Sequence, residues 1–354
     1  MKGLILCGGK GTRLRPLTYT SSKQLIPVAN KPILFYGLDA MKEAGITDIG
    51  IIVINKNSDI VDFVGDGSKW GFNITYIEQP EPLGLAHAVL TAEDYLGDDN
   101  FVMYLGDNII KEGFKELVSE FVKNKPNSQI LLAHVHDPER FGVAELKEGK
   151  VSKLVEKPKV PLSDLALVGV YMFDSNIFHA AKSIKPSARG ELEITDAIQF
   201  LIDNGYAVVP YIINGWWKDT GKLDDLLEAN RIILDDLSTE VMGEVDGESK
   251  LIGKVSIGSG TRIIKSTIRG PVIIGSNVVI KNSYVGPFTS IYDNSQILNS
   301  EIEHSIVLDG VRLLNIPVRI EDSLLGRNVE IVKSRTRPKT YRFMLGDNSQ
   351  VDII

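Results

Sequence analysis

The stretch that decides the fold of this chain is LILCGGKGTRLRP, residues 4–16. Its first four residues are apolar and predict a short buried strand, and three glycines follow within the next four residues. Glycine allows positive φ and leaves no Cβ between the backbone and a ligand, so peptide N–H groups can face an anion. One lysine and two arginines in the stretch add positive charge. We therefore predict a loop that holds a polyphosphate.

The spacing of these residues excludes two common phosphate-binding loops. A Walker loop requires Gly-Lys followed by Ser or Thr, whereas Lys10 is followed by Gly11. A dinucleotide fingerprint requires a glycine three positions after Gly11, and that position is Leu14. The remaining structural alternative is an ordinary tight turn between a strand and a helix.

A longer pattern in the same region is more specific. The strings GGKGTRLRP, residues 8–16, and KQLIPV, residues 23–28, resemble the signature of the sugar-1-phosphate nucleotidylyltransferases. The resemblance implies that Arg13 holds the departing pyrophosphate and that Lys23 neutralises a reacting phosphate, so both are candidate catalytic residues. It also implies a nucleotide-binding set that consists of Leu6, Gly8, Gly9, Gly11, Thr12 and Arg13.

Composition limits the class of protein. At 354 residues the chain is long enough for two domains with separate cores, and its net charge of −7 argues against general binding to nucleic acid or anionic membranes. The single cysteine, Cys7, excludes an internal disulfide, and we expect it to be a small packed residue where the family usually has alanine. Without a signal-peptide pattern or an apolar run of membrane-spanning length, we expect a cytoplasmic protein.

Residues 1–236 alternate short apolar runs with amphipathic segments. This alternation predicts an α/β domain with a mixed, mostly parallel sheet covered on both faces, which is the Rossmann-like nucleotidyltransferase fold of the family. The expected strands are residues 49–54, 74–77, 101–105, 130–135 and 168–173. The expected helices are residues 32–44, with Pro32 in the first turn, 85–95, 114–123 and 196–204. Ligands of such sheets bind at the carboxyl ends of the strands.

The pattern changes after a polar linker at residues 237–249. In residues 250–354, apolar residues recur seventeen apart, which predicts a left-handed parallel β-helix of the hexapeptide-repeat type followed by a tail. Two complete ladders consist of Ile257, Ile274, Ile291, Leu308 and Leu325, and of Ile263, Ile280, Ile297, Leu314 and Ile331. A third ladder, Ile268, Val285 and Ile302, fails at Arg319. An antiparallel sandwich is the alternative. The flat faces of stacked coils favour a homo-oligomer, with a trimer expected.

A second motif, QPEPLGLA at residues 79–86, follows a strand and opens a helix. The amide of Gln79 suits a pyrimidine edge, and Gly84 would let the backbone approach the base, although a proline-rich loop with an incidental glutamine is the structural alternative. The motif resembles the base-recognition loops of thymidylyl- and uridylyltransferases. The resemblance adds Gln79, Pro82 and Gly84 to the nucleotide-binding set.

Two aspartates, Asp107 and Asp219, each follow an apolar run. Taken singly, each would more often be a loop or helix-capping residue. Magnesium prefers oxygen ligands and uses one or two protein carboxylates together with phosphates and water. The resemblance implies that Asp107 and Asp219 hold Mg²⁺, with Asp107 also in contact with the nucleotide.

Four further motifs indicate the sugar side of the site. Glu156-Lys157-Pro158 resembles the family motif that grips the sugar and its phosphate, although such a string is by default a solvated turn. The resemblance implies that Glu156 binds sugar hydroxyls, that the catalytic Lys157 bridges the reacting phosphates, and that Arg189 forks onto the sugar phosphate. It also implies that the sugar pocket is lined by Gly142, Val168 and Tyr171.

The implied reaction joins a nucleoside triphosphate to a sugar 1-phosphate. Among the family, the chain resembles most the longer glucose-1-phosphate thymidylyltransferases, which carry a similar β-helix, here also called the prism. The expected substrates are therefore dTTP and glucose 1-phosphate. UTP in place of dTTP and an amino-sugar phosphate in place of glucose 1-phosphate remain open, because one methyl group separates thymine from uracil. Two rival functions also remain open: an additional acetyltransferase activity in the prism, whose single histidine is His304, and a non-catalytic nucleotide-sugar sensor.

Overall fold

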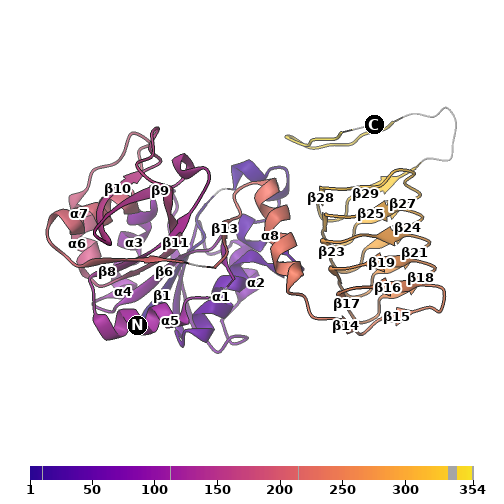
Figure 1. The fold of residues 1–354 in the computed structure, drawn as a ribbon, viewed down its shortest axis with the longest axis horizontal. Helices are drawn as coiled ribbons and strands as arrows, with labels where there is room; N and C mark the ends of the chain where they lie inside the picture. The colour runs from indigo at the N-terminus through magenta and orange to yellow at the C-terminus, as the bar shows by residue number, and fades with distance from the viewer. Residues whose placement is uncertain (10, 112, 214, 334–340, 353–354) are drawn as a thin grey trace. The chain divides into compact units, whose positions relative to one another are not determined.

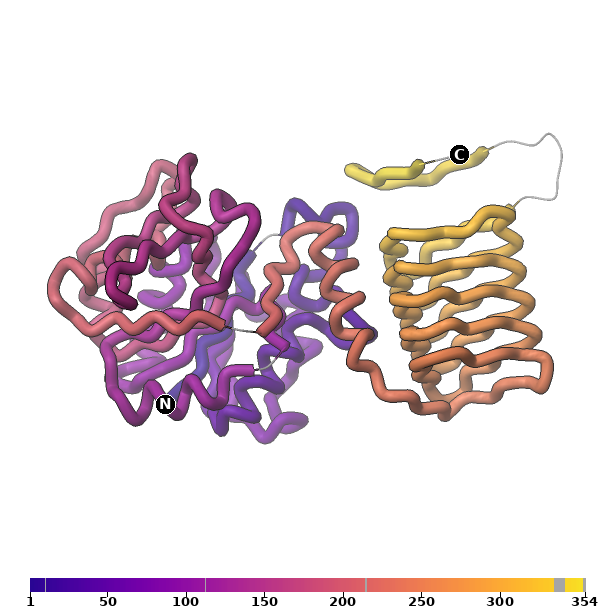
Figure 2. Tube along the Cα trace, viewed as in Figure 1, coloured from indigo at the N-terminus to yellow at the C-terminus, as the bar shows by residue number. Residues whose placement is uncertain are grey.

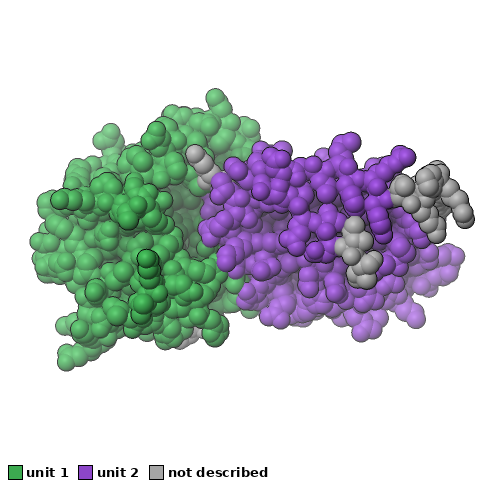
Figure 3. All heavy atoms as spheres, turned by 90° about the horizontal axis from the view of Figure 1, so that it is seen from above, with its two compact units in different colours: residues 1–10, 33–219 green, residues 11–32, 220–354 purple. Residues whose placement is uncertain are grey.

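The computed structural model describes residues 1–9, 11–111, 113–213, 215–333 and 341–352. The chain forms two compact units, coloured green and purple in Figure 3. The first unit contains residues 1–10 and 33–219, and the second contains residues 11–32 and 220–354. Among the described residues, no helix combines the length and the apolar character that crossing a membrane would require.

The first unit is built on one mixed sheet (Figure 1), in which β10, β9, β11, β6, β1, β4 and β5 follow one another, while β8 pairs with β11 and β12. The strands of this sheet are β1 (Lys2–Leu6), β4 (Asp48–Val53), β5 (Asn73–Glu78), β6 (Phe101–Leu105), β8 (Ser128–His134), β9 (Gly142–Lys147), β10 (Lys150–Glu156), β11 (Leu165–Phe173) and β12 (Val208–Ile212). The pairs β6–β1, β1–β4 and β4–β5 are parallel, whereas β11 runs antiparallel to β6 and β8. A separate antiparallel ribbon joins β7 (Asn108–Ile110) to β13 (Trp217–Asp219).

Helices cover both faces of this sheet, as the sequence predicts. On one face, Leu4, Met103 and Ile130 of the strands share a core cluster with residues of α3, α4, α6 and α7. On the other face, Gly37 of α1 lies so close to the ring of Tyr104 that a Cβ would sit 2.5 Å from it. The helices are α1 (Ile33–Glu43), α2 (Asp59–Val64), α3 (Leu85–Thr91), α4 (Glu93–Leu96), α5 (Lys115–Asn124), α6 (Asn176–Ser183) and α7 (Ile194–Asp203).

Two expected helices differ in detail from the structure. Pro32 lies outside α1, because it pairs with Pro27 in the short hairpin of β2 (Pro27–Val28) and β3 (Lys31–Pro32). The helix expected over residues 85–95 is divided into α3 and α4 at Ala92, whose φ of −94° and ψ of 4° leave the helical range.

The second unit contains a parallel β-helix whose stacked coils are visible in Figure 2. Its three sides are a sheet of β14, β17, β20, β23, β26 and β28, a sheet of β15, β18, β21, β24, β27 and β29, and a sheet of β16, β19, β22 and β25. The first side runs through β14 (Glu240–Val241), β17 (Val255–Ile257), β20 (Val272–Ile274), β23 (Thr289–Ile291), β26 (Ile306–Val307) and β28 (Leu324–Leu325). The second runs through β15 (Glu244–Val245), β18 (Arg262–Ile264), β21 (Val279–Lys281), β24 (Gln296–Leu298), β27 (Arg312–Leu314) and β29 (Glu330–Val332). The third runs through β16 (Lys250–Ile252), β19 (Thr267–Arg269), β22 (Tyr284–Val285) and β25 (Glu301–Ile302).

The constant spacing of seventeen fails in the later coils. Ile291 pairs with Val307, sixteen residues on, and Val307 pairs with Leu325, eighteen residues on, so Leu308 is not the ladder residue. In the second ladder Ile297 likewise pairs with Leu313 instead of Leu314. The physical reason is a connection that is one residue shorter, because residues 303–305 take the place of residues 286–289, which contain a Gly-Pro corner. The longer connection that follows restores the register and brings Ile320, not Arg319, opposite Ile302.

The second unit also contains parts of the chain from outside the β-helix. It includes α8 (Leu223–Asp235) and the segment of residues 11–32, in which η1 (Thr12–Leu14), η2 (Leu17–Tyr19) and η3 (Lys23–Leu25) are single turns of 3₁₀ helix. Residues 240–245, which the sequence places in a linker, form β14 and β15 and pair with the first full coil.

Candidate active site

Three loops leave the same edge of the sheet in the first unit. Leu6 ends β1 opposite Leu105 of β6, and the carbonyl of Leu6 accepts a 3.0 Å hydrogen bond from the N–H of Gly106. Gln79 follows β5, which is parallel to β4 and so ends at the same edge. Parallel pairing therefore places the start of the glycine loop, Gln79 and the turn before Asp107 at the carboxyl ends of neighbouring strands.

The glycine loop and Gln79 are close neighbours. A Cβ on Gly8 would lie 3.2 Å from the side-chain oxygen of Gln79, so a larger residue at position 8 would press on that amide. Gln79 is buried, Gly8 is partly exposed and Gly9 is exposed. Lys10, which also belongs to the expected loop, lies outside the described residues. The structure thus brings together two parts of the expected nucleotide-binding set within the first unit.

A histidine that the sequence interpretation missed holds Gln79 in place. The side-chain nitrogen Nε2 of Gln79 lies 2.8 Å from Nδ1 of His87 and donates a weaker 3.4 Å bond to the carbonyl of Gly84. Because the amide nitrogen can only donate, Nδ1 of His87 is the acceptor of this bond. In the sequence, the one indication of this role is that His87 lies in the first turn of α3, directly after the motif of residues 79–86.

Gly84 has a structural reason to be glycine that is independent of a base. Its φ is +107°, and a Cβ would lie 2.3 Å from the carbonyl oxygen of Leu192. The neighbouring backbone pairs with the same residue, since Leu192 donates to Leu83 at 2.8 Å and accepts from Ala86 at 3.0 Å. Pro82, by contrast, is exposed in this loop.

The two aspartates lie at the same end of the ribbon of β7 and β13. Asp219 pairs directly with Asn108, the residue after Asp107, in antiparallel register. Cα atoms of directly opposite residues in such a ladder are about 4.5–5.5 Å apart. Both carboxylates are only partly buried. Residues separated by more than a hundred positions in the chain are therefore adjacent in the fold.

Asn108 orients one of these carboxylates. Its side-chain nitrogen donates to Oδ1 of Asp107 at 3.2 Å, and its side-chain oxygen accepts from the indole N–H of Trp217 at 2.6 Å. Gly169 leaves room for this amide, because a Cβ there would lie 2.7 Å from the side-chain oxygen of Asn108. No sequence motif indicates these supporting roles, because they depend on contacts between distant segments.

The donor set fits a divalent cation that is shared with a substrate. Two carboxylates at one ribbon end offer the oxygen ligands that magnesium prefers, and phosphate and water complete such sites. Within the described ranges, no group of three or more His, Cys, Asp or Glu side chains is arranged to hold a metal ion by itself. Asp107 and Asp219 therefore suit an ion that arrives with a triphosphate.

The expected sugar-phosphate residues Glu156, Lys157 and Arg189 also lie together. Nη2 of Arg189 is 3.1 Å from Glu156 and 2.8 Å from the buried Glu193, and Nζ of Lys157 is 3.4 Å from Glu156. Burial raises the pKa of the Glu156 carboxyl, and repulsion from Glu193 adds to this, while Lys157 and Arg189 oppose it. In this structure Arg189 thus pairs with carboxylates, which a bound phosphate would have to displace or share.

The three expected pocket-lining residues are all buried. Gly142 pairs with Glu156 across β9 and β10, and a Cβ there would lie 2.6 Å from Thr195 and 3.2 Å from the Glu156 carboxylate. Burial raises the pKa of the Tyr171 hydroxyl, and the charge of Glu156 raises it further. Val168 is fully buried in the middle of β11, so its side chain belongs to the core.

The remaining expected residues belong to the second unit. Gly11 has φ of +60°, and its carbonyl accepts a 2.7 Å bond from the hydroxyl of Thr18. Thr12 and Arg13 are exposed in the 3₁₀ turn that follows, and Lys23 is partly buried. A Cβ on Gly11 would lie 3.1 Å from the Cβ of Lys23, so the glycine permits the close packing of these two segments.

The chain is similar in sequence to known proteins. The sequence profile of a family described as Nucleotidyl transferase matches residues 2–236. A glucose-1-phosphate thymidylyltransferase of Streptomyces antibioticus is 55% identical over 355 residues, which cover 100% of this chain and 99% of that protein. The low-salt glycan biosynthesis nucleotidyltransferase Agl11 of Haloferax volcanii is 47% identical over 358 residues, which cover 100% of both chains.

A solved structure shares the fold over about two thirds of the chain. A Bacillus anthracis protein assigned as a glucose-1-phosphate thymidylyltransferase, crystallised with sucrose, superposes with a TM-score of 0.62 at 40% identity. The match covers 68% of this chain and 98% of that protein.

Proposed function

Since this chain belongs to the nucleotidyl transferase family, we propose that it condenses dTTP with α-D-glucose 1-phosphate to give dTDP-glucose and pyrophosphate. The full-length similarity to a thymidylyltransferase supports the choice of substrates. The observation that carries the proposal is the pairing of Asp219 with Asn108, the residue after Asp107. This pairing brings the backbone of Asp219 close to that of Asp107 at one end of the β7–β13 ribbon.

The chemistry requires alignment and positive charge more than a base. An oxygen of the sugar phosphate attacks the α-phosphorus of the triphosphate, a new P–O bond forms, and pyrophosphate leaves with the electron pair of the bond that breaks. The attacking oxygen is already ionised at neutral pH, so no side chain has to remove a proton. What limits the rate is the mutual repulsion of two polyanions, which fixed cations and preorganised donors reduce.

Each expected residue has a role in this scheme. Arg13 holds the departing pyrophosphate, and Lys23 and Lys157 neutralise the reacting phosphates. Gln79 recognises the pyrimidine edge, held by His87, and Glu156 accepts hydrogen bonds from sugar hydroxyls. Arg189 forks onto the sugar phosphate. The remaining members of the set, which act through backbone or packing, are Leu6, Gly8, Gly9, Gly11, Thr12, Pro82, Gly84, Gly142, Val168 and Tyr171.

Enzymes of this family act with a divalent metal ion, and we propose that the ion here is Mg²⁺. Asp107 and Asp219 would hold it. When bound, such an ion offsets charge on the triphosphate and orients it for attack. The protein's own contribution is to fix Asp107 through the amide of Asn108, so that the carboxylate does not need to be ordered when the substrates arrive.

A substrate panel tests the proposal directly. Pyrophosphate release would be measured for dTTP, UTP, ATP and GTP, each with glucose 1-phosphate, galactose 1-phosphate and an amino-sugar 1-phosphate, with and without Mg²⁺. We expect the highest kcat/KM for dTTP with glucose 1-phosphate. Release that is faster with UTP would instead make the chain a uridylyltransferase, and no release with any pair would leave only a binding role. A further assay with acetyl-CoA and an amino-sugar phosphate tests whether the prism has an acetyltransferase activity.

We propose further that the chain is a homo-oligomer, a trimer through the β-helix. The support is the flat sides of a parallel coil stack, whose backbone and side chains repeat in register. Light scattering on the purified protein gives the mass of the assembly, and a mass other than three chains would contradict the trimer.

A further inference from the structure

The segment that carries Arg13 and Lys23 belongs to the β-helix unit. Residues 11–32 follow directly on β1, yet they cluster with residues 220–354 (Figure 3). The cations that the proposed function assigns to the triphosphate are therefore carried by the same compact body as the prism. This raises the question of which contacts fix that segment.

The first contact is made by the buried side chain of Asn230 in α8. Its oxygen accepts hydrogen bonds from the N–H of Ala29 at 2.8 Å and from the hydroxyl of Ser290 at 3.0 Å. Its nitrogen donates to the carbonyl of Phe288 at 3.0 Å. One amide thus connects the turn between β2 and β3 to the coil that contains β23.

The second contact comes from the next residue of the same turn. The side-chain nitrogen of Asn30 donates a 2.7 Å hydrogen bond to the carbonyl of Ile291, the last residue of β23. Asn30 has φ of +59°, in the left-handed region that asparagine tolerates and glycine favours. Two successive residues, Ala29 and Asn30, are therefore held against one coil of the β-helix.

Between this turn and the cations the chain has little freedom. Residues 24–29 are all buried, and Lys23 begins the 3₁₀ turn in which the N–H of Ile26 donates to the carbonyl of Lys23. Gly11 packs closely on Lys23, because a Cβ on Gly11 would lie only 3.1 Å from the Cβ of Lys23. A shift of Asn30 would accordingly be passed to Lys23 and to the loop that carries Arg13.

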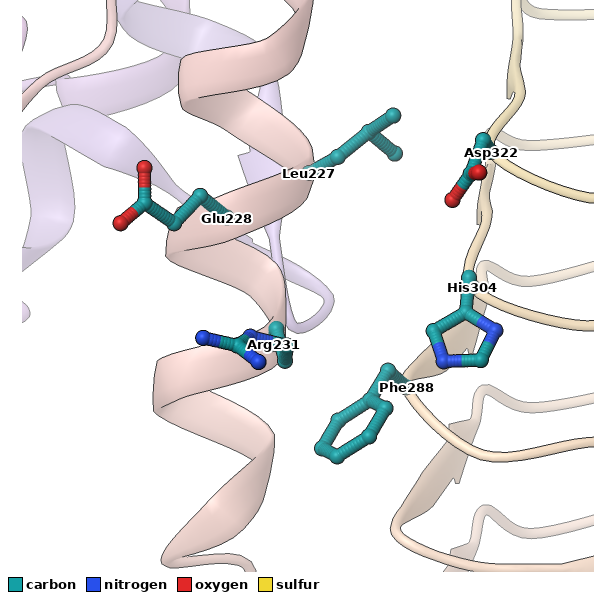
Figure 4. A pocket seen from close by; sticks show the side chains of 6 residues that line it. All are labelled: Leu227, Glu228, Arg231, Phe288, His304 and Asp322. Carbon is teal, nitrogen blue, oxygen red and sulfur yellow. The ribbon is translucent and has the colours of Figure 1, made fainter.

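Elsewhere, the packing between α8 and the β-helix is incomplete. A cavity of about 170 Å³ is lined by Leu227, Glu228 and Arg231 of α8 and by Phe288, His304 and Asp322 of the β-helix corners. In Figure 4, Leu227 points towards these corners, whereas Glu228 extends to the opposite side of the helix. The hydrogen bonds of Asn230 and Asn30 supply contacts to the coil of β23 that do not depend on the side chains around this cavity.

We infer that Asn30 is a positioning residue for the nucleotidyl transfer, because its bond to Ile291 ties the segment with Arg13 and Lys23 to the β-helix. This inference rests on the proposed function. The prism then serves as a scaffold that determines the positions of Arg13 and Lys23. Loss of the bond leaves every charge in place but lets the segment shift, and a displacement of about 1 Å can lower a rate by up to about a hundredfold.

The test is Asn30→Gly in the full-length protein. Glycine adopts the same positive φ and lacks the amide, so the substitution removes the bond without straining the turn. The matched control is Asn299→Gly, at a φ of +49°, whose side-chain amide bonds only along a column of corner asparagines, Asn282 and Asn315. We expect kcat to fall at least about tenfold for Asn30→Gly and less than about twofold for the control, with similar unfolding midpoints.

A double-mutant cycle separates positioning from general destabilisation. If Asn30 acts through Lys23, Asn30→Gly should cost clearly less in a Lys23→Ala background than in the native protein. Equal losses in both backgrounds, or native kcat for Asn30→Gly, would overturn the inference. A Lys23→Ala variant with native turnover would instead contradict the catalytic assignment of the proposed function, so the two failures are distinguishable.

Discussion

The side-chain amide of Asn108 donates a hydrogen bond of 3.2 Å to the carboxylate of Asp107. The same amide accepts from Trp217, so that a buried asparagine links the expected metal ligand to the strand that ends at Asp219. Asp107 is therefore held by a neighbouring side chain. Substitution of that neighbour should have a different effect from substitution of Asp107 or Asp219.

Asn108→Ala should weaken activation by the divalent ion. The substitution frees Asp107 and leaves the indole N–H of Trp217 unpaired, and loss of such a supporting partner typically costs about 10–100-fold in metal affinity or activity. Titration of activity with Mg²⁺ measures the effect. The control is Asn127→Ala, which removes a 2.7 Å bond to Asp174 and a 2.9 Å bond from the N–H of Ala207, neither of which involves the ribbon. Equal metal requirements in the two variants would contradict the role of Asn108.

Asp219→Asn should lower turnover much more than stability. The change keeps the shape of the side chain and its place opposite Asn108 while it removes one negative charge. Loss of one preorganised charge contact typically costs about a hundredfold to a thousandfold in rate. Asp107→Asn should behave alike. Steady-state kinetics with saturating Mg²⁺ check the prediction, and near-native turnover of either variant would refute the metal assignment.

Glu156 should make the stability of the protein depend on pH. Because its pKa is raised above the ordinary value of 4.5, the folded protein binds this proton more tightly than the unfolded chain does. The contribution of Glu156 to the free energy of unfolding is then greatest below 4.5 and falls as the pH rises through the folded-state pKa. Relative to Glu156→Gln, the native protein should lose stability over that range, which urea unfolding at a series of pH values measures. A constant difference between the two proteins would contradict this.

His87→Leu should raise the KM for the nucleotide and leave kcat nearly unchanged. The imidazole accepts the bond that orients Gln79, and a lost hydrogen bond of this kind is worth about 1 kcal/mol, or about fivefold in binding. The matched control is His134→Leu, which removes an exposed imidazole that pairs with Asp164. Unchanged nucleotide KM in His87→Leu, or an equal rise in both variants, would show that Gln79 needs no such support.

Gly84→Ala should destabilise the fold beyond the cost of positive φ. The added methyl would lie 2.3 Å from the Leu192 carbonyl, whereas a methyl on Gly205, at φ of +75°, would meet nothing within 4 Å. Alanine in the left-handed region costs about 1–2 kcal/mol by itself. We expect Gly205→Ala to show that cost and Gly84→Ala to exceed it clearly in denaturant unfolding. Equal losses would mean that the Leu192 backbone moves away easily.

Several features of the structure were readable from the sequence because they depend on local pattern. The apolar run before Gly8 fixes a buried strand, and strand–helix alternation up to residue 236 fixes a sheet covered by helices. The repeat of apolar residues likewise fixes a stack of parallel coils, since each coil can bury its inward side chains only against its neighbours. Periodicity determines burial, and burial determines these elements.

The tertiary structure decided what depends on contacts between distant residues. The shortened corner at residues 303–305 moves the ladder from Leu308 to Val307, and only the pairing of whole coils reveals it. Likewise, no local pattern connects Asn30 to Ile291, 261 positions away, or assigns the segment of residues 11–32 to the β-helix unit. The sequence by itself determined most of the strands, helices and coils, and it predicted a glycine-rich loop for a polyphosphate. The contacts that hold these elements together were decided by the tertiary structure, because hydrogen bonds between residues so far apart in the chain form only when the chain has folded.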